Sequence, residues 1–206
     1  LATHRFYSPN DSKEAEIVIV TPKAKGDWEV RTLVKLPFVH RFDILERNGV
    51  HYLIACALKS GHEYKEDWSM PGKVYAAVLP EDLSGFDENH QLKLEVLKDE
   101  KFAEHAGDRE NLSDFSKKSV SKISADCGVY LFTPPAKPNE PWEIKQLIDT
   151  PASDAVLVDL DEDGEKELVV LSPFHGDVIS IYKKTDSVYQ KVYEYEKTAE
   201  FTHAIY

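Results

Sequence analysis

Long apolar runs are missing from this 206-residue chain, and their absence excludes several classes of protein. No apolar segment approaches the roughly 20 residues that an α-helix needs to cross a bilayer. The first five residues also lack the hydrophobic segment of a signal peptide. We therefore expect no membrane partner and a cytoplasmic location. A leader that has been removed would instead indicate a secreted or periplasmic protein.

Cysteine and basic residues are scarce as well. Cys56 and Cys127 lie far apart in the sequence, each beside an apolar burst, which favours two buried thiols and a reducing compartment over a disulfide. Lysine and arginine number 25 against 37 aspartates and glutamates, which gives a formal net charge of -12. Such a chain repels a phosphate backbone, so nucleic acid is not an expected partner.

Long helical periodicity is absent too, and a repeat of short apolar strands takes its place. Residues 19–30 are echoed by residues 131–144: each has a strand ending in Thr-Pro, a turn containing proline and lysine, and a strand opening at Trp-Glu. Related junctions put four residues at equivalent positions, with successive spacings of 65, 49 and 49 residues: His40, His105, Asp154 and His203. This period suits a unit of four short antiparallel strands, such as one blade of a β-propeller.

The repeat predicts an all-β fold, a β-propeller with about four four-stranded antiparallel blades in a single domain over residues 1–206. The blades are expected at 1–35 plus 201–206, 38–98, 102–148 and 153–196. In the clearest blade the strands are expected at 155–159, 167–171, 178–182 and 188–194. The last segment either closes a four-bladed ring or belongs to a fragment of a larger propeller. The missing initial methionine and the end within an apolar run favour the fragment.

An acidic turn in the last predicted blade is the first candidate for chemistry. Its carboxylates fall at alternate positions before a glycine and a glutamate: Asp159, Asp161, Asp163, Gly164 and Glu167. Hard cations such as calcium bind oxygen-rich loops of this kind. The EF-hand spacing fails, because the twelfth position is Val170. We predict calcium at the turn from Asp159 to Glu167, with a solvated acidic turn as the alternative.

The repeat-equivalent histidines form a second candidate site. Innermost strands of a propeller line its central channel, and the junctions before them emerge at the channel mouth. We therefore predict a divalent metal at that mouth, held by His40, His105 and His203. The alternative for each of these histidines is a hydrogen bond to a neighbouring loop.

The connections between second and third strands should emerge on the same face. They carry Lys59, His62 and His175, to which we assign catalytic roles as acids or bases. The loop over residues 59–72 is long enough to be functional, although an insertion on a tolerant surface explains it equally. Trp68 in this loop suits stacking on a sugar ring or covering the core.

Two family resemblances extend this interpretation. The Asp-x-Asp-x-Asp-Gly turn at 159–164 resembles that of FG-GAP and VCBS repeats, which joins the first two strands of propeller blades. Residues 38–42, 59–62 and 172–177 together resemble bacterial propeller proteins. They are also distantly similar to the propeller domain of the aldos-2-ulose dehydratase (anhydrofructose dehydratase) family.

The resemblances imply two different functions. The dehydratase likeness implies a metal-dependent carbon–oxygen lyase that removes water from a keto-sugar, with the channel-mouth histidines as metal ligands or proton acceptors. The second hypothesis is a non-catalytic binding or scaffold propeller for protein or glycan partners, with structural calcium. The expected partners are thus a small carbohydrate or a protein or glycan ligand.

Overall fold

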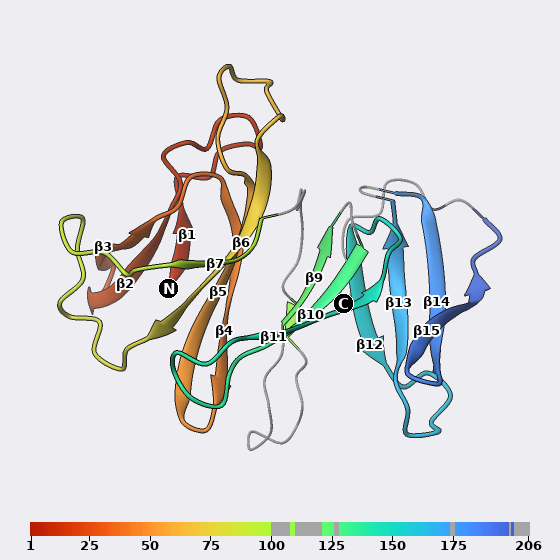
Figure 1. The fold of residues 1–206 in the computed structure, drawn as a ribbon. Helices are drawn as coiled ribbons and strands as arrows, with labels where there is room; N and C mark the ends of the chain where they lie inside the picture. The colour runs from red at the N-terminus through yellow and green to blue at the C-terminus, as the bar shows by residue number, and fades with distance from the viewer. Residues whose placement is uncertain (100–107, 110–120, 126–127, 174–175, 198, 200–206) are drawn as a thin grey trace. The chain divides into compact units, whose positions relative to one another are not determined.

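The fold is all-β, as the sequence predicts. The computed structural model describes residues 1–99, 108–109, 121–125, 128–173, 176–197 and 199 (Figure 1). These residues form fifteen strands and no helix. The described part of the chain therefore contains no membrane-spanning helix. The chain divides into two compact units, Leu1–Ala103 and Glu104–Tyr206.

The first unit contains two antiparallel sheets. One has the order β1-β2-β3, with strands Ala2–His4, Glu16–Ala24 and Asp27–Lys35. The other has the order β4-β5-β6-β7, with strands Val39–Arg47, Val50–Lys59, Pro71–Leu79 and Glu95–Lys98. Strands that are consecutive in the chain are therefore neighbours in each sheet.

The tight turn between β4 and β5 follows directly from its sequence. Asn48 and Gly49 have φ values of 54° and 76°. A type I′ turn requires positive φ at both central residues, and Asn-Gly is the pair that adopts it most readily. The turn brings Arg47 opposite Val50 and leaves no room for a loop that could hold an ion.

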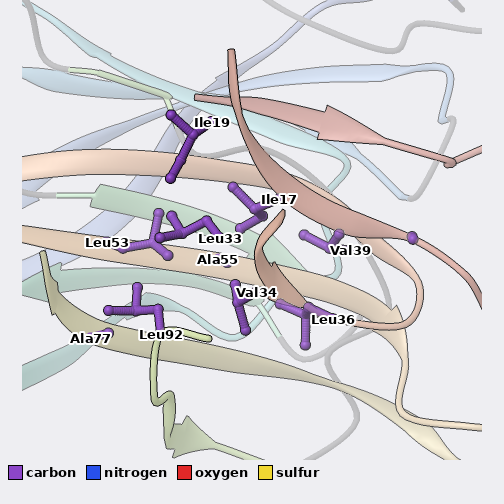
Figure 2. Close-up of a cluster of buried hydrophobic side chains, with 11 residues drawn as sticks. Ile17, Ile19, Leu33, Val34, Leu36, Val39, Leu53, Ala55, Ala77 and Leu92 are labelled. Atoms are coloured by element: carbon purple, nitrogen blue, oxygen red, sulfur yellow. The ribbon is translucent and has the colours of Figure 1, made fainter. Parts of the chain in front are cut away.

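Apolar side chains from both sheets of the first unit meet in one core (Figure 2). Ile17 of β2, Leu33 of β3 and Leu53 of β5 have no exposed surface. Burying a side chain of this size contributes about 1.5–3 kcal/mol. The core thus fixes β5, whose last residue is Lys59, against the first sheet.

The described residues of the second unit also form two antiparallel sheets. One has the order β11-β10-β9-β8, with strands Glu143–Ile148, Gly128–Thr133, Ser121–Ala125 and Asp108–Arg109. The other has the order β12-β13-β14-β15, with strands Asp154–Val158, Glu167–Ser172, Val178–Thr185 and Val188–Glu194. Val129 of β10 packs in one buried cluster with Leu168 and Val170 of β13.

The four strands predicted between residues 155 and 194 are confirmed, with boundaries that differ by one residue in β12 and β13 and by three in β14. The prediction ended the third strand at Tyr182, whereas β14 continues to Thr185. Asp186 and Ser187, with φ values of 49° and 72°, then form a two-residue turn into β15. The extension matters because it places Lys183 inside a strand, where pairing with Gln190 of β15 fixes its backbone.

Candidate functional site

The connection between β12 and β13 is a folded acidic loop. Glu162 and Gly164 adopt positive φ values of 60° and 87°, which reverse the chain direction. The Gly164 amide donates a hydrogen bond of 3.0 Å to Oδ2 of Asp159. The Glu165 amide donates one of 2.8 Å to Oδ1 of Asp163. These bonds orient the carboxylates locally, as aspartates commonly do in turns.

Glu167 ends the acidic loop and is the first residue of β13. It is only 4% exposed, and its Oε2 accepts a hydrogen bond of 2.8 Å from the Leu160 amide. Burial of an ionised carboxylate is costly unless a cation or several donors compensate for it. Among the described residues, Oε1 of Glu167 and Oδ1 of Asp159 are buried and accept no hydrogen bond.

The separation of these carboxylates fits a calcium ion. Ligand oxygens of Asp159, Asp161 and Glu167 lie within 4.8 Å of one another, and no other such group of three or more occurs in the described part of the chain. Calcium–oxygen distances are about 2.3–2.6 Å, so ligands on opposite sides of one ion lie about 5 Å apart. The loop therefore provides oxygen donors at suitable spacing.

A lysine ammonium lies against the same carboxylates. Nζ of Lys183 is 2.6 Å from Oδ2 of Asp161, 2.6 Å from Oδ2 of Asp163 and 3.6 Å from Oε1 of Glu167. The hydrogen bonds to Asp161 and Asp163 raise the pKa of Lys183. The hydrogen bond from Lys183 in turn lowers the pKa of Asp163. One ammonium therefore faces three carboxylates, and the group as a whole keeps a negative charge.

Lys59, predicted as catalytic, ends β5 with a fully buried side chain. Its Nζ donates hydrogen bonds of 3.1 Å to the carbonyls of Lys65 and Asp67, and one of 3.5 Å to Oδ1 of Asn10. Burial lowers the pKa of Lys59, while the carboxylates of Asp67 and Glu66 oppose that shift. These contacts connect the following loop to the end of β5 and to Asn10, and the catalytic role of Lys59 stays a prediction.

Two aromatic rings complete the surroundings of Lys59. Its ammonium lies 5.0 Å from the ring centroid of Phe38 and 4.7 Å from that of Trp68. The His62 ring meets the Phe38 ring edge-on, with centroids 5.1 Å apart. The structure thus brings Lys59 and His62 to one buried ring. Phe38 has a φ of 60°, a strained value for a large side chain, and its amide is bonded to the Ser12 carbonyl at 2.8 Å.

The predicted channel-mouth metal ligands are only partly described. His40 lies in β4, where its ring packs at 4.8 Å from the Phe6 ring. His105 and His203 lie outside the described residues, as does the predicted catalytic His175. Neither His40 nor His62 belongs to a group of three potential metal ligands among the described residues.

Lys183 is the residue that the sequence analysis missed at the acidic turn. Leu168 pairs with Tyr182 at the end of the ladder between β13 and β14, and the adjoining residues Glu167 and Lys183 are in side-chain contact at 3.6 Å. That neighbourhood depends on strand register. An alignment of the two strand sequences that places opposite charges across from each other would have identified Lys183.

No protein-family model matches this chain, and neither a curated protein nor a solved structure matches it. The geometry of the acidic turn is therefore the main basis for an assignment of function.

Proposed function

We propose that this chain is a calcium-binding module of a β-propeller in which the ion has a structural role. The observation that carries the proposal is the pair of buried carboxylate oxygens, Oδ1 of Asp159 and Oε1 of Glu167, that accept no hydrogen bond among the described residues. Together with Asp161 they supply the oxygen-rich, negatively charged surroundings that calcium prefers.

The ion would hold the first two strands of the sheet together at their connecting loop. Asp159 and Asp161 belong to the loop after β12, whereas Glu167 begins β13. Carboxylates this close repel one another, and a dication removes that repulsion while it joins both sides of the loop. Asp154 begins β12 and the loop follows its last residue, Val158, so the ion would lie at the opposite end of the strand from Asp154.

Sheet connectivity supports the propeller part of the proposal. Each of the four sheets is built from strands that are consecutive in the chain and hydrogen-bonded in that order. Up-and-down sheets of this kind are the units of a propeller blade. A rigid array of such sheets suits a binding or scaffold role toward a protein or glycan partner. The carbohydrate lyase stays a prediction, because three of its five histidines lie outside the described residues.

Calcium-dependent thermal unfolding of wild type and an Asp159→Asn variant tests the calcium site. The asparagine keeps an oxygen that can accept the Gly164 amide but removes one negative ligand. At 100 times the dissociation constant, calcium should stabilise the wild type by about 2.7 kcal/mol, which raises the melting temperature by about 5–10 °C. The variant should lose most of that increase.

Asp186→Asn is the matched control. It removes one negative charge from a turn of the same sheet, and asparagine tolerates the positive φ of 49° found there. Its calcium response should equal that of the wild type. A wild-type melting temperature that is the same in calcium and in EDTA would leave only the solvated acidic turn.

A further inference from the structure

The side chain of Lys183 occupies the place where a cation would contact the acidic turn. We propose that its ammonium group is a resident counter-ion that calcium must displace, so that Lys183 sets the calcium affinity of the turn. This inference rests on the proposed calcium site. It adds a residue from β14, which belongs neither to the loop nor to the two strands that the loop connects.

Strand register explains why the lysine reaches the turn. Leu168 of β13 lies opposite Tyr182 of β14 at the end of their ladder, where Glu167 precedes Leu168 and Lys183 follows Tyr182. The two side chains meet there, with Nζ of Lys183 at 3.6 Å from Oε1 of Glu167. From there the lysine extends over the loop, with Nζ at 2.6 Å from both Asp161 and Asp163. Its backbone is fixed by strand pairing with β15, in which Lys183 lies opposite Gln190.

The ammonium and a calcium ion need the same carboxylate, that of Asp161. The 2.6 Å between Nζ and Oδ2 of Asp161 is as long as a calcium–oxygen bond. Two cations that share one carboxylate at such distances repel each other strongly. The lysine side chain is 33% exposed, and its flexible stem allows the charged group to move into water when an ion binds.

Lys183 contacts the carboxylates of the acidic turn incompletely, so calcium can bind more of their oxygens than the ammonium does. Its two short hydrogen bonds go to Asp161 and Asp163, and only the longer contact of 3.6 Å reaches Glu167. A single ammonium has three donors, whereas calcium takes six to eight oxygen ligands. Without calcium, Lys183 neutralises the acidic turn in part. With calcium bound, the ion takes over that role.

Isothermal titration calorimetry with calcium, on the EDTA-treated 206-residue chain, tests this competition in Lys183→Met. Methionine keeps an unbranched side chain only one atom shorter and removes the charge. Calcium affinity should rise about fivefold or more, the range usual for coupled sites. The control is Lys191→Met, which removes the same charge from an exposed ion pair with Glu194 in the same sheet. Its affinity should stay within about twofold of wild type.

The outcomes separate this inference from the proposed function. If wild type and Lys183→Met bind calcium equally well, Lys183 does not compete and the inference is wrong, while the calcium site stands. The inference is supported if Lys183→Met binds calcium more tightly than wild type and Lys191→Met does not, even when wild-type binding is too weak to measure. If neither protein binds calcium, both the inference and the proposed function are wrong.

Lysine labelling provides a direct readout in the wild-type protein. N-hydroxysuccinimide acetate reacts with free amines, and peptide mass spectrometry gives the labelling rate of each lysine. Saturating calcium should increase the rate at Lys183 severalfold and leave Lys191 unchanged, because only the displaced ammonium loses its carboxylate partners. A Lys183 rate that calcium leaves unchanged would contradict displacement.

Discussion

The ammonium nitrogen of Lys59 lies 4.7 Å from the ring centroid of Trp68, although Lys59 is fully buried and Trp68 is 41% exposed. An exposed aromatic ring thus covers a buried cation, an arrangement that favours the charged lysine where water is excluded. Because the same ammonium donates to the carbonyls of Lys65 and Asp67, it organises the loop between β5 and β6.

Lys59→Met should destabilise the first unit. The substitution leaves two loop carbonyls without their donor, and the bond to Asp67 is buried. We expect the free energy of unfolding to fall by about 1–3 kcal/mol in urea denaturation. Lys65→Met is the matched control, since it removes an exposed ion pair with Asp11 from the same loop and should cost less than about 1 kcal/mol. Equal losses in the two variants would contradict the structural role of Lys59.

Asp67 should make the stability of the same loop depend on pH. Hydrogen bonds from the amides of Glu63 and Ser69 lower the pKa of Asp67 from 3.8 to about 2. The unfolded chain therefore binds this proton at a higher pH than the folded chain does. The stabilisation by Asp67 is complete above its unfolded pKa and is lost as the pH falls through the folded one.

Asp67→Asn tests that pH dependence. Urea denaturation at pH 7 should show the variant to be less stable than wild type, and the difference should shrink between about pH 4 and pH 2 as Asp67 is protonated. Asp11→Asn, which removes an exposed carboxylate nearby, is the control. A difference for Asp67→Asn that does not change over this range would contradict the assignment.

Arg31 should anchor the connection between β6 and β7. Its Nη1 donates hydrogen bonds to the carbonyls of Leu83, Ser84 and Phe86 at 3.3, 3.0 and 2.7 Å. Arg31→Met should lower the free energy of unfolding by about 1–3 kcal/mol and accelerate proteolysis within residues 80–91. Lys23→Met, which breaks the exposed pair with Glu29 at the end of the same sheet, should change neither.

Cys56 should react slowly in the folded protein. Burial raises the pKa of its thiol to about 12. At pH 8 the reactive thiolate is then rarer than in an ordinary thiol by about three orders of magnitude. Alkylation by iodoacetamide, followed at the Cys56 peptide by mass spectrometry, should be at least about a hundredfold slower than in guanidinium chloride. Comparable rates in both conditions would show that the thiol is accessible and ionised.

The strands and the acidic turn were determined by sequence alone. Asn48 and Gly49 define their hairpin turn, and short apolar bursts mark β12 to β15, because turn residues and alternation act over a few neighbouring positions. The carboxylates from Asp159 to Glu167 likewise form one local motif. The metal at the channel mouth stays a prediction, since two of its three predicted ligands, His105 and His203, lie outside the described residues.

Tertiary structure decided which partners these local features meet. Lys183 reaches the acidic turn only because the register of β13 and β14 places it beside Glu167, and a shift by one residue would turn it to the other face. The surroundings of Lys59 likewise depend on folding, which brings it to Asn10 and Trp68, 49 residues before it and nine after it. Its predicted catalytic role stays a prediction. Such contacts depend on chain packing, and neither composition nor local pattern specifies them.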